Sequence, residues 1–269
     1  MIAASLRDHN GGIGMNHAYV YDAAFHNMAA TGSADAARRI ISVVQTVLPL
    51  QSVVDFGCAR ATWLRQWQAQ GVHDVIGVDG DYVDRSKLEI DPRRFVAHDL
   101  ARPCHLGRRF DLAQSLEVAE HLSPSRAAGF VADIVAHADV VLFSAAPPGQ
   151  GGENHLNEQP GHYWQSLFLD HDYVAIDCLR PLLAREKGVP AWYRYNLVLY
   201  VRRGSLKRIA PFARQFQMRE GEAISDPSPP AYKLRKLIIR SFPRPLCDRL
   251  ARWNARRYPT DQACYGGES

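Results

Sequence analysis

Cysteine pairs and long apolar runs are both missing from the sequence. Its five cysteines are widely spaced and include no Cys-x-x-Cys pair, so we expect neither a disulfide framework nor a cysteine zinc site. No stretch of about 18 apolar residues occurs, and the N-terminus lacks the apolar run of a signal peptide. We therefore predict a protein without a transmembrane helix, located in the reducing cytoplasm.

Strong net charge is also missing, but the charge is unevenly distributed. The 269 residues carry a formal charge of +4, while residues 202–257 hold 15 Lys and Arg against 4 Asp and Glu. Residues 1–201 hold 17 basic residues against 22 acidic ones. The chain is long enough to bury a core, and 46% of its residues are hydrophobic, which supplies the side chains for that core. These counts predict a globular body with a basic C-terminal extension.

Short apolar runs alternate with helical patterns through the body of the chain. This alternation predicts an α/β fold, namely a Rossmann-like, doubly wound, mostly parallel seven-stranded sheet whose last strand is antiparallel. Ser33 is the predicted N-cap of the first core helix. We expect a lid or leader segment at 1–32, a main domain at 33–203 and a basic helical extension at 204–269. The expected strands are 52–56, 75–79, 95–98, 110–115, 140–144, 173–177 and 195–201, and the expected helices include 33–48, 60–70 and 124–137.

Acidic residues end three successive predicted strands. Asp55 opens the turn after the first strand, Asp79 ends the second and Asp99 follows the third. In an open parallel sheet, ligands bind beyond the carboxyl ends of the strands, where a carboxylate such as Asp79 can accept both ribose hydroxyl hydrogens. A complete Gly-x-Gly-x-x-Gly motif is missing after the first strand, which disfavours a dinucleotide.

These strand ends resemble those of the class I S-adenosylmethionine-dependent methyltransferases. The resemblance covers residues 34–202 and rests on 54–58, 77–80, 97–100 and the run Ser115-Leu116-Glu117-Val118-Ala119-Glu120-His121-Leu122. It implies S-adenosylmethionine as cofactor, with S-adenosylhomocysteine as product. It also implies that Asp55, Gly57, Cys58 and Ala59 hold the methionine part, Asp79 and Gly80 the ribose, and Asp99 and Leu100 the adenine, while Ser115, Leu116 and Glu117 line the mouth of the acceptor site.

The turn after the first strand departs from that family. Glycines are usual at the positions of Ala59 and Ala61. Because alanine disfavours positive φ, we expect the turn to be slightly displaced or to keep negative φ. A catalytically silent cofactor-binding or scaffold protein is therefore the alternative to an enzyme.

Two polar clusters can handle the proton of a methyl acceptor. In the second, which spans residues 144–164, His155 is the predicted general base because imidazole titrates near neutral pH. The first cluster spans residues 117–121. Its His121, and Glu158 in the second cluster, are further catalytic candidates. Asn157, Tyr163, Trp164 and, from the lid segment, Tyr21 are the predicted substrate contacts.

Each of these residues also has a purely structural interpretation. Glu120 and His121 could fix a loop, Glu158 could stabilise the start of a helix, and Tyr163 and Trp164 could belong to the core. His121, His155, His162 and Glu158 could together bind a divalent metal, but no His-x-x-x-His or comparable local pair occurs, so we expect no metal.

The predicted function is O-methylation of a small-molecule or glycan hydroxyl, with an RNA methyltransferase as an alternative. The basic extension holds no recognisable RNA-binding module, which makes nucleic acid the less favoured partner. A basic amphipathic helix near 233–240 instead favours an anionic membrane surface, at the inner face of the membrane. Packing on the body or dimerisation would explain the helix equally well, and the oligomeric state stays open.

Overall fold

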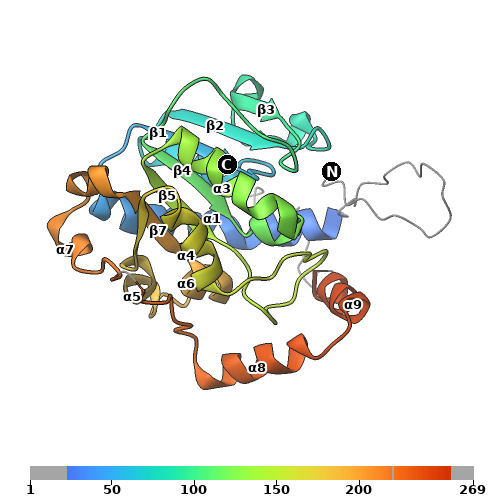
Figure 1. The fold of residues 1–269 in the computed structure, drawn as a ribbon. Helices are drawn as coiled ribbons and strands as arrows, with labels where there is room; N and C mark the ends of the chain where they lie inside the picture. The colour runs from blue at the N-terminus through green and yellow to red at the C-terminus, as the bar shows by residue number, and fades with distance from the viewer. Residues whose placement is uncertain (1–22, 220, 256–269) are drawn as a thin grey trace, which may run out of the picture.

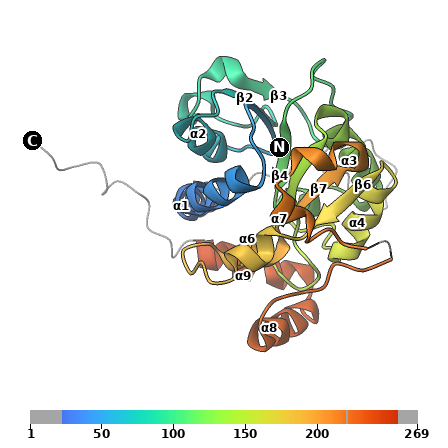
Figure 2. The ribbon, with the colours of Figure 1, turned by 90° about the vertical axis from the view of Figure 1, so that its left-hand side faces the viewer.

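One seven-stranded sheet with helices on both faces forms the centre of the protein (Figures 1 and 2). The computed structural model describes residues 23–219 and 221–255, with side chains at 33–219 and 221–253. The strand order is β3-β2-β1-β4-β5-β7-β6, and only β7 runs antiparallel to its neighbours β5 and β6. The predicted fold class is thereby confirmed. The strands are β1 (Ser52–Phe56), β2 (Asp74–Asp79), β3 (Phe95–Ala97), β4 (Leu112–Leu116), β5 (Val140–Ser144), β6 (Tyr173–Ile176) and β7 (Val198–Arg202).

The helices follow the strands in the manner of a doubly wound fold. They are α1 (Ala23–Val47), α2 (Thr62–Ala69), α3 (Ala127–His137), α4 (Gly161–Leu169), α5 (Leu179–Leu183), α6 (Ala191–Asn196), α7 (Pro211–Arg214), α8 (Pro230–Arg240) and α9 (Arg244–Ala255). Short 3₁₀ turns lie at η1 (Arg85–Lys87), η2 (Pro92–Arg94), η3 (Ala119–His121), η4 (Pro124–Arg126) and η5 (Arg203–Arg208). Among the described residues, no helix is both long and apolar enough to cross a membrane.

Two apolar clusters, one on each face of the sheet, hold these layers together. Val53 of β1 belongs to the cluster that α1 and α2 cover, whereas its neighbour Val54 belongs to the cluster under α3 and α4. Successive strand residues point to opposite faces, so a strand that is buried on both sides needs a continuous apolar run. This requirement explains why the short apolar runs located the strands.

Several boundaries differ from the prediction, and two of these differences have a clear cause. Ser33 is not an N-cap, because α1 begins at Ala23 and runs through it. The four alanines between residues 23 and 30 are strong helix formers, and they extend the helix upstream. Tyr195 and Asn196 end α6, so β7 begins only at Val198. Short apolar runs fit a helix or a strand equally well, which explains the second error.

The C-terminal helices α8 and α9 lie beyond the carboxyl ends of the strands (Figure 1). Lys236, only 7% exposed, pairs with Asp226 at 2.5 Å. Arg244 donates a hydrogen bond to the carbonyl of Leu156, and the carboxylate of Asp248 accepts one from the amide of Asn154. These helices are therefore docked on the loop that follows β5.

Candidate functional site

A left-handed backbone shapes the turn between β1 and α2. Gly57 has φ +90° and donates its amide to the carbonyl of Val78, and a Cβ there would lie 2.3 Å from a methyl group of Val118. Ala59 (φ 48°) and Ala61 (φ 64°) also adopt positive φ, so the expectation of negative φ is wrong. A left-handed alanine costs roughly 1–2 kcal/mol, and such strain is typical of ligand-binding turns.

Two buried carboxylates face the cavity beside this turn. Asp79 accepts hydrogen bonds from the amides of Ala59 and Gly80, both at 2.7 Å, and from the Tyr82 hydroxyl at 2.5 Å. Burial raises the pKa of Asp79 although the amides of Ala59 and Gly80 oppose that change. Burial also raises the pKa of Asp55, to about 7. Asp79 thus ties the turn after β1 to the end of β2, where the resemblance puts the ribose.

A cavity of about 710 Å³ extends from these carboxylates across the ends of the strands. Three predicted cofactor residues do not line it. Gly80 donates its amide to Asp79, Asp99 accepts from the amide of Ala101, and the Ser115 hydroxyl donates to the carbonyl of Phe56. The predicted cofactor residues that do line it are Asp55, Gly57, Cys58, Ala59, Asp79, Leu100, Leu116 and Glu117.

Sequence reasoning missed Thr62, Trp63 and Tyr82, which also line the cavity. A signal for Tyr82 was present, because an aromatic residue three positions after Asp79 can bend back onto that carboxylate.

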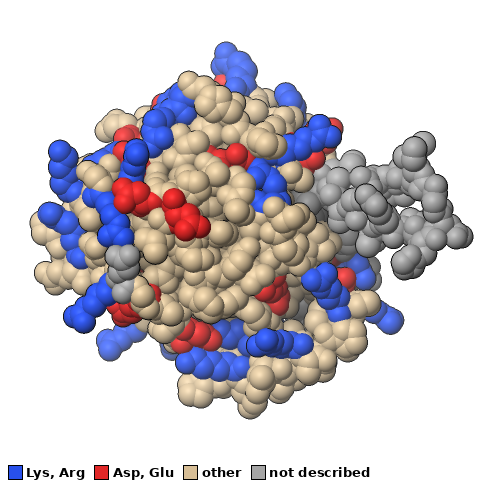
Figure 3. Space-filling model, viewed as in Figure 1, with Lys and Arg blue, Asp and Glu red and all other residues tan. Residues whose placement is uncertain are grey.

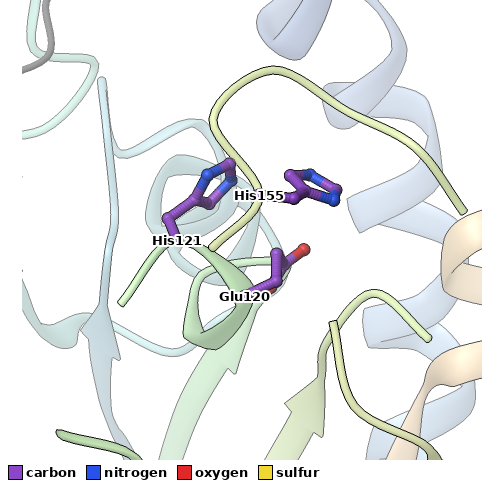
Figure 4. Close-up of side chains that lie close together, drawn as sticks. All are labelled: Glu120, His121 and His155. Carbon is purple, nitrogen blue, oxygen red and sulfur yellow. The ribbon is translucent and has the colours of Figure 1, made fainter. Parts of the chain in front are cut away.

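Glu120, His121 and His155 form a compact cluster on the same cavity (Figure 4). The turn η3 carries the first two, and its Glu120 carbonyl accepts the amides of Leu156 and Asn157 at 2.8 and 2.9 Å. These bonds hold the loop after β5 against η3. The rings of His121 and His155 consequently meet edge to face, with centroids 4.9 Å apart. Two residues predicted as catalytic from different segments are thus brought together.

The carboxylate of Glu158 contacts the Nδ1 atom of His155. This carboxylate accepts the amides of Gly149 and Gly151 at 2.7 and 3.0 Å and lies 2.8 Å from Nδ1 of His155. Burial opposes ionisation, but the hydrogen bonds from His155 and the two amides hold the pKa of Glu158 below its ordinary value. Glu158 is therefore placed to orient the imidazole, and it lies before the start of α4 at Gly161; its catalytic role stays a prediction.

The carboxylate of Glu120 is buried without a partner. Its residue is 0% exposed, and neither carboxylate oxygen has a hydrogen bond. Burial and the neighbouring Glu117 raise the pKa of Glu120 well above its ordinary value, although the nearby backbone amides of Glu120 and Ala146 oppose that change. Burial, together with His155, lowers the pKa of His121 to about 3, so this imidazole is neutral. The loop is fixed by the backbone of Glu120, which leaves its side chain without a structural explanation.

Glu117 belongs to a separate network at the end of β4. Its carboxylate accepts hydrogen bonds from Gln150 at 2.6 Å and Asn196 at 3.2 Å, and Asn196 also donates to Gln150. Glu117 has φ 56°, a strained conformation of the kind found at functional sites. This network joins β4, the loop after β5 and α6 around one side of the cavity.

Three of the predicted substrate contacts, Asn157, Tyr163 and Trp164, do not line this cavity. Asn157 is 2% exposed and accepts a hydrogen bond from Gln159. Tyr163 and Trp164 pack against each other, and Trp164 contacts Phe143 in the core and lines a second cavity of about 400 Å³. Tyr21 lies outside the described residues. The structure thus leaves the substrate roles of all four residues as predictions.

The wall opposite the strand ends comes from α6, α8 and α9. Arg235 donates a hydrogen bond to the Gln150 carbonyl at 3.0 Å and stands 5.5 Å from the centre of the Tyr232 ring. Sequence reasoning treated the segment of α8 and α9 as an extension of the main domain, because nothing in the local sequence reveals which surface a distant helix covers. The lining residues of these helices include Trp192, Tyr193, Tyr232, Arg235, Ile239, Cys247, Leu250 and Trp253.

Fold, strand-end carboxylates and cavity together define a nucleotide-type binding site in an open α/β sheet. A family model described as a methyltransferase domain matches residues 19–179, so the chain belongs to this family of methyltransferases and has the class I, S-adenosylmethionine-dependent fold. No curated protein matches the chain in sequence.

Two solved structures illustrate the shared fold. The sugar N-methyltransferase KedS8 from Streptoalloteichus sp. is 16% identical with a TM-score of 0.52, and the match covers 76% of this chain and 99% of that one. An O-methyltransferase family protein from Burkholderia thailandensis is 12% identical with a TM-score of 0.51, and the match covers 66% of this chain and 58% of that one. At such identities the likeness establishes the fold alone.

Proposed function

We propose that this methyltransferase transfers the methyl group of S-adenosylmethionine to a hydroxyl oxygen of a small-molecule or glycan acceptor. The observation that carries the proposal is the single cavity that joins Asp55 and Asp79 to the cluster of Glu120, His121 and His155. Its volume of about 710 Å³ has room for the cofactor and part of an acceptor, since ligand pockets span roughly 300–1,000 Å³.

The lining of the cavity favours an acceptor with flat or apolar faces. Trp63, Trp192, Tyr193 and Tyr232 line the cavity, and Arg235 adds a positive charge. Aromatic walls with a few fixed polar groups are typical of pockets for small organic ligands. The names of the two similar structures, one a sugar N-methyltransferase and one an O-methyltransferase family protein, are compatible with such an acceptor.

His155 is the residue on which we expect loss of the hydroxyl proton to depend. With Nδ1 held by Glu158, the ring is oriented by a carboxylate, as a base in a catalytic pair would be. In the simplest case His155 itself accepts the hydroxyl proton, which is the predicted role of general base. In the transfer, the oxygen forms a bond to the methyl carbon, the carbon–sulfur bond breaks, and its electron pair stays on the sulfur of S-adenosylhomocysteine.

Cofactor binding is tested first, by calorimetry with S-adenosylmethionine and S-adenosylhomocysteine. We expect both to bind the wild type and to bind Asp79→Asn about 10- to 100-fold more weakly, because a charge-assisted hydrogen bond is worth about 1.5–3 kcal/mol. Asp81→Asn, at an exposed position near it, is the matched control. Absence of binding by the wild type would overturn the proposal.

The acceptor is tested with methyl-labelled cofactor and panels of sugars, sugar nucleotides and phenols. We expect label on an oxygen, identified by NMR of the product. Label on nitrogen, or transfer only to RNA, would contradict the proposed acceptor while leaving the methyltransferase assignment intact.

A further inference from the structure

The cluster of Glu120, His121 and His155 has the composition of a metal site. One donor atom from each residue lies within 4.8 Å of the other two. Ligands of a first-row divalent cation sit about 2.0–2.2 Å from the ion, so they are roughly 3–4 Å apart. Small side-chain rotations would close the present set around an ion, and Figure 4 shows the three side chains around a common space.

The buried carboxylate of Glu120 calls for a positive partner. The residue is 0% exposed, and neither of its oxygens accepts a hydrogen bond of good geometry; the nearby amides of Glu120 and Ala146 bring no positive charge. A buried, unpaired polar group costs free energy that folded proteins rarely leave uncompensated. A divalent cation would satisfy the oxygens directly.

Both histidines are already oriented as metal ligands usually are. Nδ1 of His155 meets Glu158 at 2.8 Å, and Nδ1 of His121 meets the carbonyl of Asn154 at 3.2 Å. In metal sites the ligating histidine almost always donates its other ring N–H to a carboxylate or a backbone carbonyl. In a neutral imidazole this arrangement places the lone pair on Nε2.

We propose that Glu120, His121 and His155 bind a divalent transition-metal ion on the acceptor side of the cavity. Two imidazoles and one carboxylate suit Mn²⁺, Fe²⁺, Co²⁺ or Zn²⁺ and leave coordination positions open for a substrate oxygen. His121 and His155 are candidate metal ligands in the sequence, but we expected no metal because they lie 34 residues apart and no His-x-x-x-His pair occurs, and Glu120 was not part of that set.

The purpose of the ion rests on the proposed hydroxyl methylation. An acceptor hydroxyl bound to the ion becomes more acidic and releases its proton to water, and the resulting oxygen attacks the methyl carbon. His155 then acts through coordination, and its direct role as general base is replaced.

Binding of the metal alone provides the test. The full chain is treated with a chelator, dialysed against Mn²⁺ or Zn²⁺, and its metal content and affinity are measured by mass spectrometry and calorimetry. We expect one ion per chain, a loss of affinity of at least 100-fold in Glu120→Gln, and a 10- to 100-fold loss in Glu158→Gln, which keeps the three ligands but weakens the orientation of one. Glu153→Gln, a buried carboxylate on the same cavity outside the cluster, should bind the ion like the wild type.

Thermal unfolding supplies a second measurement that does not depend on activity. The ion should raise the Tm of the wild type and leave that of Glu120→Gln unchanged. Wild-type protein that binds no ion, or Glu120→Gln that binds it equally well, would overturn the proposal. If the metal-free enzyme still methylates a hydroxyl at the full rate, His155 acts as the base itself. A chain that binds the ion but never binds S-adenosylmethionine would refute only the proposed function.

Discussion

The two halves of the cavity are built in different ways. The cofactor half comes from consecutive strand ends, where Asp55 is one of the last two residues of β1 and Asp79 ends the neighbouring parallel strand β2. The acceptor half joins η3, the loop after β5 and the distant helices α8 and α9. The first half is fixed by the fold itself, whereas the second depends on contacts between segments far apart in the chain. A class of reaction is therefore easier to infer than an acceptor.

Removal of the His155 side chain should have the largest effect. For His155→Ala we expect turnover to fall by about 10²- to 10⁴-fold, the usual contribution of a group that handles the proton of the reacting oxygen. Affinity for S-adenosylmethionine should not change, because the cofactor half is separate. The measurement is kcat together with calorimetry, and His162→Ala, an exposed histidine of the same region, is the control. If turnover and affinity for S-adenosylmethionine fell by the same factor, the two halves of the cavity would not be functionally independent.

Asp55 should make stability depend on pH. Its folded pKa of about 7 exceeds the ordinary value of 3.8, so the folded state favours the protonated form. The contribution is fully present below about pH 4, is lost as pH rises towards 7, and then stays constant. Asp55→Asn should therefore be more stable than the wild type at pH 8, by about 2–4 kcal/mol, and should differ least at pH 4.

Denaturant midpoints of the Asp55→Asn variant at pH 4, 6 and 8 provide the measurement. Asp81→Asn, which is exposed, should show no such trend. A constant difference between wild type and Asp55→Asn across this range would show that Asp55 is not held in its protonated form. The same variant should bind the cofactor more weakly, since the resemblance puts Asp55 beside the methionine part.

Gly149→Ala should disturb only the acceptor half. A Cβ at this position would lie 2.1 Å from the backbone oxygen of Lys236, which forces α8 away from the loop. We expect a several-fold rise in the KM for the acceptor and an unchanged Kd for S-adenosylmethionine. Gly107→Ala carries a similar backbone cost at φ +70° but would meet nothing within 4 Å. If Gly107→Ala changed the KM equally, the contact with α8 would be irrelevant.

The outer face of α8 should give the smallest effect. Leu234, Leu237 and Ile238 are 58%, 66% and 50% exposed, and Lys233 and Arg240 are exposed beside them. Figure 3 shows Lys and Arg among uncharged surface at the lower edge, where α8 lies. An apolar stripe flanked by cations complements an anionic membrane surface. We propose this surface as the partner of α8.

Co-sedimentation with vesicles containing anionic lipid tests this proposal. Serine at all three apolar positions should weaken binding several-fold, while the Kd for S-adenosylmethionine stays unchanged. Equal sedimentation of the variant and the wild type, or binding to neutral vesicles only, would contradict the membrane proposal. If the wild type were a dimer and the variant a monomer, a second copy of the chain would be the partner of α8.

Much of the cofactor half could be predicted, because apolar runs mark buried strands and the residue after each run marks a strand end. Asp79 was placed correctly by this rule. The backbone of Ala59 and Ala61 could not be predicted, since the strain of positive φ is compensated by packing such as that of Gly57 on Val118. The ring contact between His121 and His155 could not be derived from the sequence either, because it depends on hydrogen bonds from two backbone amides of the loop after β5 to one carbonyl of η3.

The docking of α8 and α9 bears on how acceptor specificity could be exchanged between enzymes. Hydrogen bonds of Arg235, Arg244 and Asp248 all end on backbone atoms of residues 150–156, next to the cluster of Glu120, His121 and His155. Grafting foreign C-terminal helices alone would leave these atoms unpaired, and a side chain at position 149 would block the new helix. The loop and the two helices thus form one transplantable module, and a chimera that keeps them together has the best prospect of a new acceptor range.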